Sequence, residues 1–209
     1  MALGRLGRLL GLPSPAWEQA TYWALDLETG GLDPRRDAIL AVGMVPIREG
    51  TIRLGEAWRT LVRPEAGRSI APESIRAHQL VPSELQAAPP IAQVLLEIDA
   101  RLEDAVLLVH YRAVDVAFLR RAFARCGREW SRPTIVDTAT LLHRIAARDR
   151  RRRPELPEER RALNLSRARL ERGLPAHVEH DALSDALATA ELFLVLREVL
   201  GARTIGELT

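Results

Sequence analysis

The stretch TYWALDLETGGLDPRRDAILAVGMV, residues 21–45, decides the fold. It indicates the strand YWALDLE and most of a second strand, DAILAVGMVPIREG, which continues to residue 50; a turn that begins TGG joins them. The first strand is apolar on both sides of two acids, Asp26 and Glu28, so we expect it to lie centrally in a sheet. Residues i and i+2 of a strand point to the same side, so the two carboxylates project together.

The rest of the chain alternates strands and helices. TIRLGEAWRTLVRP predicts a third strand in an antiparallel meander, and Pro64 and Pro72 then break the pattern. Further on, SELQAAPPIAQVLLEIDARLED indicates a helix, AVLLVHY a strand, DVAFLRRAFARCG a helix, and TIVDTATLLHRI a strand that turns helical. RDRRRRPELPEER indicates a solvated loop, and LNLSRARLERGL and HDALSDALATAELFLVLREVL predict the last helices. This order predicts an α/β fold with helices packed on a mixed sheet.

Composition sets broad limits. The chain has 209 residues and a formal net charge of +2, so a nucleic-acid partner would have to meet a local basic patch. All 30 basic residues are arginine, which fits either a GC-rich genome or phosphate recognition. The one cysteine, Cys126, excludes an intramolecular disulfide. No apolar run is long enough to span a membrane, and we expect a cytoplasmic protein with no membrane partner.

One domain is expected, with short extensions at both ends. We assign residues 1–20 to an N-terminal leader that can be flexible, residues 21–203 to the functional domain, and residues 204–209 to a C-terminal tail.

The paired acids of the first strand point to a metal site. Two adjacent carboxylates repel each other unless a cation neutralises them, and oxygen ligands suit Mg²⁺ or Mn²⁺. The alternative is an edge strand whose acids are solvated. The apolar neighbours of Asp26 and Glu28, and the glycine turn that follows, argue against it.

Four more polar residues stand at or just before expected helix starts, and each has a plain structural explanation. Asp115 follows the LLVHY strand and could be a helix N-cap. In HDALSDA, Asp181 is the expected N-cap of the last helix. His180 would then lie on the preceding loop, as a surface or capping histidine in the plain interpretation, and Asp185 would be a favourable acid near a helix N-terminus.

Taken together, the four acids and the histidine resemble the DEDD exonuclease superfamily in its histidine-bearing branch, which includes the proofreading epsilon subunit of bacterial DNA polymerase III. The three motifs appear here as LDLETGGL, LLVHYRAVDVAFLRRAF and HDALSDA, with lesser similarities at SIRAHQLVPSEL and VDTATLLHR. The resemblance spans roughly Trp23 to Leu200. The sequence departs from the family pattern at Tyr111, where asparagine is usual, and at Val114, where an aromatic residue is usual.

The resemblance implies an RNase H-like fold with a five-stranded mixed central sheet, and a 3′→5′ exonuclease that uses two divalent cations, Mg²⁺ or Mn²⁺. Carried over residue by residue, the metal ligands would be Asp26, Glu28, Asp115 and Asp185. The resemblance also makes His180 the general base, a task that histidine side chains suit near neutral pH.

The substrate would be held by the glycine turn and the residues around it. By the resemblance, the 3′ end would lie at Thr29, Gly30, Gly31 and Leu32, with Tyr111 and Phe118 beside it. The glycines would allow close approach of the backbone to the terminal nucleotide. Leu32 and Phe118 could instead be core residues. Arg150–Arg153 could contact nucleic acid or be a solvated run followed by acids.

The leading hypothesis is therefore a nuclease that acts on the 3′ end of DNA, single-stranded or frayed. The alternatives are the same chemistry on RNA ends or short oligoribonucleotides, and a non-catalytic module that binds nucleic acid or a polymerase. A missing ligand would favour the last, but all four acids and His180 are present. A polymerase or repair partner, and a monomer or homodimer, are compatible with the sequence.

Overall fold

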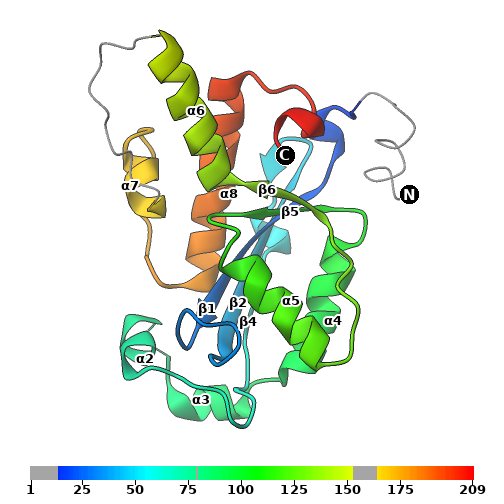
Figure 1. The fold of residues 1–209 in the computed structure, drawn as a ribbon, viewed down its shortest axis with the longest axis vertical. Helices are drawn as coiled ribbons and strands as arrows, with labels where there is room; N and C mark the ends of the chain where they lie inside the picture. The colour runs from blue at the N-terminus through cyan, green and yellow to red at the C-terminus, as the bar shows by residue number, and fades with distance from the viewer. Residues whose placement is uncertain (1–13, 79, 153–163) are drawn as a thin grey trace.

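One mixed sheet runs through the middle of the protein, as seen in a computed structural model that describes residues 14–78, 80–152 and 164–209 (Figure 1). The strands are β1 (Tyr22–Thr29), β2 (Ile39–Arg48), β3 (Thr51–Ile52), β4 (Trp58–Leu61), β5 (Val106–Val109) and β6 (Thr134–Asp137). The order across the sheet is β3-β2-β1-β5-β6, and β4 also pairs with β2. β1 is antiparallel to β2 and parallel to β5, so it has the expected central place.

The sheet has six strands where five were expected. The predicted third strand, residues 51–64, is divided by a 3₁₀ turn, Leu54–Glu56, into β3 and β4. β3 pairs with the end of β2 and β4 with its middle part, both antiparallel. β2 has ten residues, so one edge of it is long enough for both. The meander is confirmed, but the count of five was wrong because Gly55 lies in a turn that interrupts the pairing.

Most of the helices form a layer on each face of the sheet, and two short ones, Pro72–His78 and Pro82–Ala87, lie beyond the end of the sheet (Figure 1). They are α2 (Pro72–His78), α3 (Pro82–Ala87), α4 (Ile91–Leu102), α5 (Asp115–Arg125), α6 (Thr138–Arg152), α7 (Leu165–Leu170) and α8 (Ala182–Leu200). Trp23, Leu25 and Leu27 of β1 form one hydrophobic core with α4 and α5. Tyr22 and Ala24 point the other way and form a second core with α6 and α8.

Three predictions in the helical regions were wrong. The single helix expected over SELQAAPPIAQVLLEIDARLED is divided into α3 and α4, because the two prolines between them cannot continue a helix. Pro72 was expected only to break a pattern, but it is the first residue of α2, where its missing N–H costs no hydrogen bond. The arginine-rich segment was expected to be a loop, yet α6 continues through Arg152. Arginine is a good helix former, and the buried side chains of Leu141, Leu142 and Ile145 anchor the same helix. Arg153 lies outside the described residues.

The start of α8 lies directly against the sheet because β2 carries a glycine there. Gly43 is paired with Asp26 in the register of β1 and β2. A Cβ atom on Gly43 would overlap the carbonyl group of Ala182, the first residue of α8. This close approach brings the N-terminal turn of α8 next to the carboxylates of β1.

The ends of the described chain pack on the second core. Trp17 is buried against Tyr22 and Phe193, and the backbones of Ala16 and Thr204 form an isolated β-bridge. The proposed leader's first 13 residues lie outside the described residues. Within the described ranges, no helix has the length and apolar character needed to cross a lipid bilayer.

Candidate active site

Asp26 and Glu28 lie near the C-terminal end of β1, on the face covered by α8. They share this face with Tyr22 and Ala24 because side chains alternate along a strand. Glu28 is 5% exposed and Asp26 is partly buried. The two predicted carboxylates are therefore inside the protein and do not belong to a solvated edge strand.

Asp115 is the first residue of α5 and is 5% exposed. The N-cap position belongs to Val114, so Asp115 is not the capping residue that the plain interpretation suggested. Burial raises the pKa of Asp115 to about 8. Backbone N–H groups of Asp115 itself and Leu27 act in the opposite direction, and the charges of Asp137 and Glu28 raise this pKa further.

Asp185 is held by two groups from the loop before α8. The backbone N–H of His180 donates to one carboxylate oxygen over 2.9 Å, and Nε2 of His177 lies 2.7 Å from the other. Asp181 is the N-cap of α8, as predicted, and accepts a hydrogen bond from the backbone N–H of Ser184. His180 has a left-handed backbone (φ +62°) and an exposed side chain.

The acids are close enough to share a cation. Asp26, Glu28 and Asp185 each offer one oxygen, and these three oxygens lie within 4.8 Å of one another. Burial, followed by the charges of Asp115, Glu28 and Asp185, raises the pKa of Asp26 well above its usual range. Oε1 of Glu28 is buried and has no hydrogen-bond partner within the described residues. Mutually repelling, incompletely paired carboxylates fit a hard divalent ion, which would remove the repulsion.

His78 is a second histidine at the carboxylates, from the end of α2. Its Nδ1 lies 2.5 Å from Oε2 of Glu28, and its Nε2 lies 3.2 Å from the carbonyl oxygen of Thr29. Burial lowers the pKa of His78, but the hydrogen bond and charge of Glu28 outweigh it, so the net shift is upward. The rings of His78 and His180 stand edge to face at 5.8 Å between centroids, so His180 also faces Glu28.

The loop of the second motif is held by an acid at the end of β6. Asp137 accepts hydrogen bonds from the backbone N–H groups of Tyr111 and Ala139 and from the Thr140 hydroxyl. Tyr111 has φ +70° and is 49% exposed, so its ring is available to a ligand. Asparagine would tolerate this left-handed backbone better than tyrosine does.

The turn after β1 is built tightly around its glycines. The Thr29 hydroxyl donates to the carbonyl oxygen of Gly31 over 2.7 Å. A Cβ on Gly30 would lie 2.5 Å from the carbonyl oxygen of Ser69, and one on Gly31 would overlap the Asp37 carboxylate. Leu32 is 83% exposed, so it is not a core residue. Phe118, by contrast, is 1% exposed within the core formed with α4 and α5.

Sequence reasoning did not assign His78, His177, Asp137 or Gly43 to the site. His78 and Asp137 stood in stretches that resembled the family, yet no role was attached to them. His177 had one signal, its place in the loop that also carries His180. Gly43 had none, because a glycine in a strand does not reveal which segment will approach it.

His177 is expected to orient Asp185 for metal binding. We predict that His177→Leu weakens the affinity for Mn²⁺ by about 10- to 100-fold, the usual effect of losing a partner that orients a metal ligand. His177→Gln keeps a donor in a similar place and should recover part of the loss. Titration calorimetry with Mn²⁺ on the three proteins checks this, and equal affinities would show that Asp185 needs no such support.

Comparisons with known proteins agree with this arrangement. The profile of the family RNase_T, described as exonuclease, matches residues 23–193. The DNA polymerase III subunit epsilon-like protein of Rhodobacter capsulatus is 33% identical over 96% of this chain, which covers 27% of that protein. The PolC-type DNA polymerase III of Thermotoga petrophila is 31% identical over 88% of the chain, which covers 12% of it. The chain thus spans about a quarter or less of the length of these two relatives.

The fold is that of known exonucleases. A complex of Escherichia coli exonuclease I with single-stranded DNA superposes with a TM-score of 0.72 at 20% identity, covering 86% of this chain and 41% of the other. The expected RNase H-like fold is therefore confirmed. Exonucleases of this family depend on divalent metal ions, which the cluster of Asp26, Glu28 and Asp185 suits. The match over residues 23–193 shows that the chain belongs to the RNase_T exonuclease family, within the DEDD superfamily.

Proposed function

We propose that the protein is a metal-dependent 3′→5′ exonuclease that removes nucleotides from the 3′ end of DNA. The observation that carries the proposal is the convergence of Asp26, Glu28 and Asp185 within 4.8 Å, beside a buried Asp115. Such a group of acids is costly to bury without a cation, and phosphodiester hydrolysis is a reaction that uses one.

The four acids would hold two divalent cations, Mg²⁺ or Mn²⁺. Bound there, the cations would activate a water molecule and stabilise the leaving 3′ oxygen. Asp26 and Glu28 come from the rigid centre of the sheet, and Asp115 and Asp185 from two helix starts. A scaffold of this kind holds the ligands in place before the substrate arrives.

His180 is the proposed general base, which takes the proton from the attacking water. Its exposed ring lies near Glu28, and its backbone is tied to Asp185. His180→Asn should therefore lower the single-turnover rate by about 10²- to 10⁴-fold, as expected for lost general-base catalysis. Thermal stabilisation by Mn²⁺ should be retained, which separates proton transfer from metal binding. If His180→Asn cleaves at the wild-type rate, another group must be the general base.

The terminal nucleotide would lie on the turn that follows β1. Leu32 exposes 83% of its surface there, so it can wedge against the last base at little cost in stability. Thr29, Gly30 and Gly31 would contact the sugar, and Tyr111 would pack beside it. Phe118, which lies in the core, would support this pocket from below and not touch the nucleotide.

DNA is favoured over RNA by the proteins that this chain resembles. The relatives include subunits of DNA polymerase III, and exonuclease I is seen with single-stranded DNA. We also propose a polymerase or repair protein as partner, because relatives carry this domain within much longer chains.

The test compares substrates of matched sequence. Single-stranded DNA and RNA are incubated with the protein in Mg²⁺, Mn²⁺ or EDTA, and the products are resolved by length. We expect faster shortening of DNA in either metal and none in EDTA. Faster shortening of RNA would show that RNA, not DNA, is the substrate. If the folded protein cleaves neither, binding of nucleic acid would be its function.

A further inference from the structure

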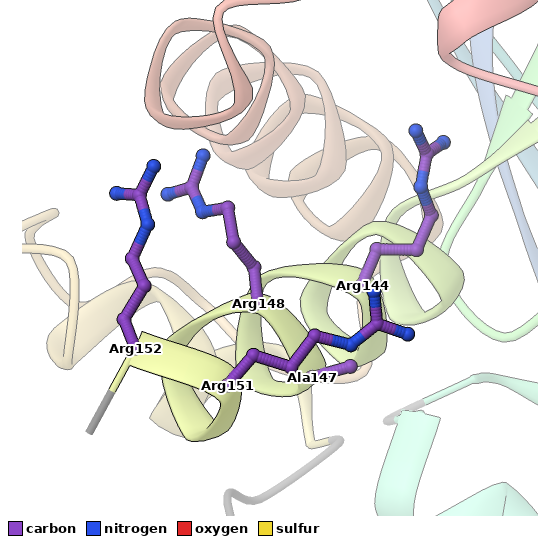
Figure 2. A pocket seen from close by; sticks show the side chains of 5 residues that line it. All are labelled: Arg144, Ala147, Arg148, Arg151 and Arg152. Atoms are coloured by element: carbon purple, nitrogen blue, oxygen red, sulfur yellow. The ribbon is translucent and has the colours of Figure 1, made fainter. Parts of the chain in front are cut away.

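A row of arginines lies on α6, away from the acids of the active site. Arg144, Arg148, Arg151 and Arg152 line one hollow of about 430 Å³ together with Ala147, and we call these four residues the arginine patch (Figure 2). Their spacing puts them on one side of the helix, and they span about 12 Å along its axis.

Within the described ranges, little negative charge compensates the patch. The lining residues include no acid. Arg148 donates to the carbonyl oxygen of Val199 over 2.9 Å and lies 3.9 Å from Asp149. Arg144, Arg151 and Arg152 are exposed, and among the described residues none of them is within ion-pair distance of an acid. Elsewhere, arginines such as Arg125 and Arg167 are paired with glutamates at 2.6 Å and 3.2 Å.

Interaction with the negative end of the α6 dipole does not explain the whole patch. Basic side chains in the last turn of a helix favourably meet its negative end, which accounts for Arg151 and Arg152. Arg144 stands about two turns earlier, where this effect has faded. A row of guanidinium groups that the described acids neutralise only in part can attract anions, and each group can pair with phosphate through two parallel hydrogen bonds.

The arginine patch and the carboxylates lie on the same side of the sheet. Asp26 and Glu28 face the side of the sheet that α6 and α8 cover. Arg148 bonds to Val199, near the end of α8, whereas Asp185 is in the first turn of that helix. Fourteen residues of helix separate Val199 from Asp185, about 21 Å.

We propose that the arginine patch binds the phosphate backbone of the substrate strand upstream of its 3′ end. At an axial repeat of about 3.4 Å per nucleotide, 21 Å corresponds to roughly six nucleotides, and fewer for a stretched strand. An acidic protein segment is the competing ligand. The proposal rests on the proposed function, because only a nucleic-acid substrate would run from the carboxylates to α6.

Length dependence tests the proposal. The double variant Arg151→Ala/Arg152→Ala removes two exposed side chains of the patch. The matched control, Arg120→Ala/Arg121→Ala, removes two exposed neighbours on α5, in the layer on the other face of the sheet. Each protein is assayed for kcat/KM on single strands of about 4 and about 20 nucleotides over a range of salt, and for binding of the longer strand in EDTA by fluorescence anisotropy.

The patch variant should lose about 10-fold in kcat/KM on the long strand and less than about 2-fold on the short one, while its salt slope for the long strand falls by about 1.4. The control should match the wild type. Equal losses of kcat/KM on both lengths, or no loss on either, would overturn the proposal. If neither length is affected, an acidic protein segment becomes the expected ligand of the patch. If the longer strand binds in EDTA through the patch but is not cleaved in the presence of metal, the patch is a nucleic-acid site and the proposed nuclease activity is wrong.

Discussion

Asp26→Asn is expected to abolish cleavage and, in metal-free buffer, to stabilise the fold. Loss of a metal ligand should lower the rate by at least about 10³-fold, the equivalent of roughly 4 kcal/mol of transition-state stabilisation. The neutral amide also removes a charge that burial and four neighbouring carboxylates disfavour, as the raised pKa of Asp26 shows. In EDTA at neutral pH, the Tm should therefore rise by a few degrees.

The pH dependence of this gain follows from the direction of the shift. An acid whose pKa is higher in the folded state destabilises the fold above its unfolded pKa, so the penalty that Asp26→Asn removes is absent below about pH 4 and grows as the pH rises. Calorimetric melts in EDTA at several pH values measure it. Mn²⁺ should raise the Tm of the wild type far more than that of the variant. A variant that is less stable at every pH would show that the Asp26 carboxylate is paired, not repelled.

Gly43→Ala is expected to damage the active site without touching any of its acids. The added methyl group would collide with the carbonyl group of Ala182 and force the first turn of α8 away from β2. Overpacking of this kind costs about 1–3 kcal/mol of folding free energy. The displaced turn carries Asp185 and follows His180, and misplacement by about 1 Å can cost about 10²-fold in rate.

Gly55→Ala provides the control for this substitution. Gly55 lies in the 3₁₀ turn between β3 and β4, and a Cβ atom added to it would meet nothing within 4 Å. Its replacement should change neither the Tm nor the rate. Denaturant melts and single-turnover assays on both variants check the pair. Full activity in Gly43→Ala would mean that α8 can shift without moving Asp185 relative to Asp26.

The central part of this protein could be predicted from the sequence because its signals are local. An apolar strand interrupted at i and i+2 by acids reports both burial and a shared face, which β1 confirms. Asp181 could be assigned as the N-cap of α8 from its own position before a helical pattern. These inferences need only the alternation of a strand and the hydrogen-bonding needs of a helix start.

The contacts that could not be predicted join segments that are far apart in the sequence and meet only after folding. His78 reaches Glu28 across about 50 residues of chain, and the contact between Gly43 and Ala182 spans far more. The extent of α6 was missed for another reason. A run of arginines has no apolar period, and the helix is continued by its own propensity from a buried first half.

The direction of digestion tests the central claim most directly. One DNA strand is labelled either at its 3′ end or at its 5′ end and incubated in Mg²⁺ with the wild type and with Asp26→Asn. We expect the 3′ label to be released as a mononucleotide at the earliest times, while the 5′-labelled strand shortens step by step, and Asp26→Asn to do neither. Early release of the 5′ label, internal fragments, or unchanged cleavage by Asp26→Asn would contradict a 3′→5′ exonuclease built on these carboxylates.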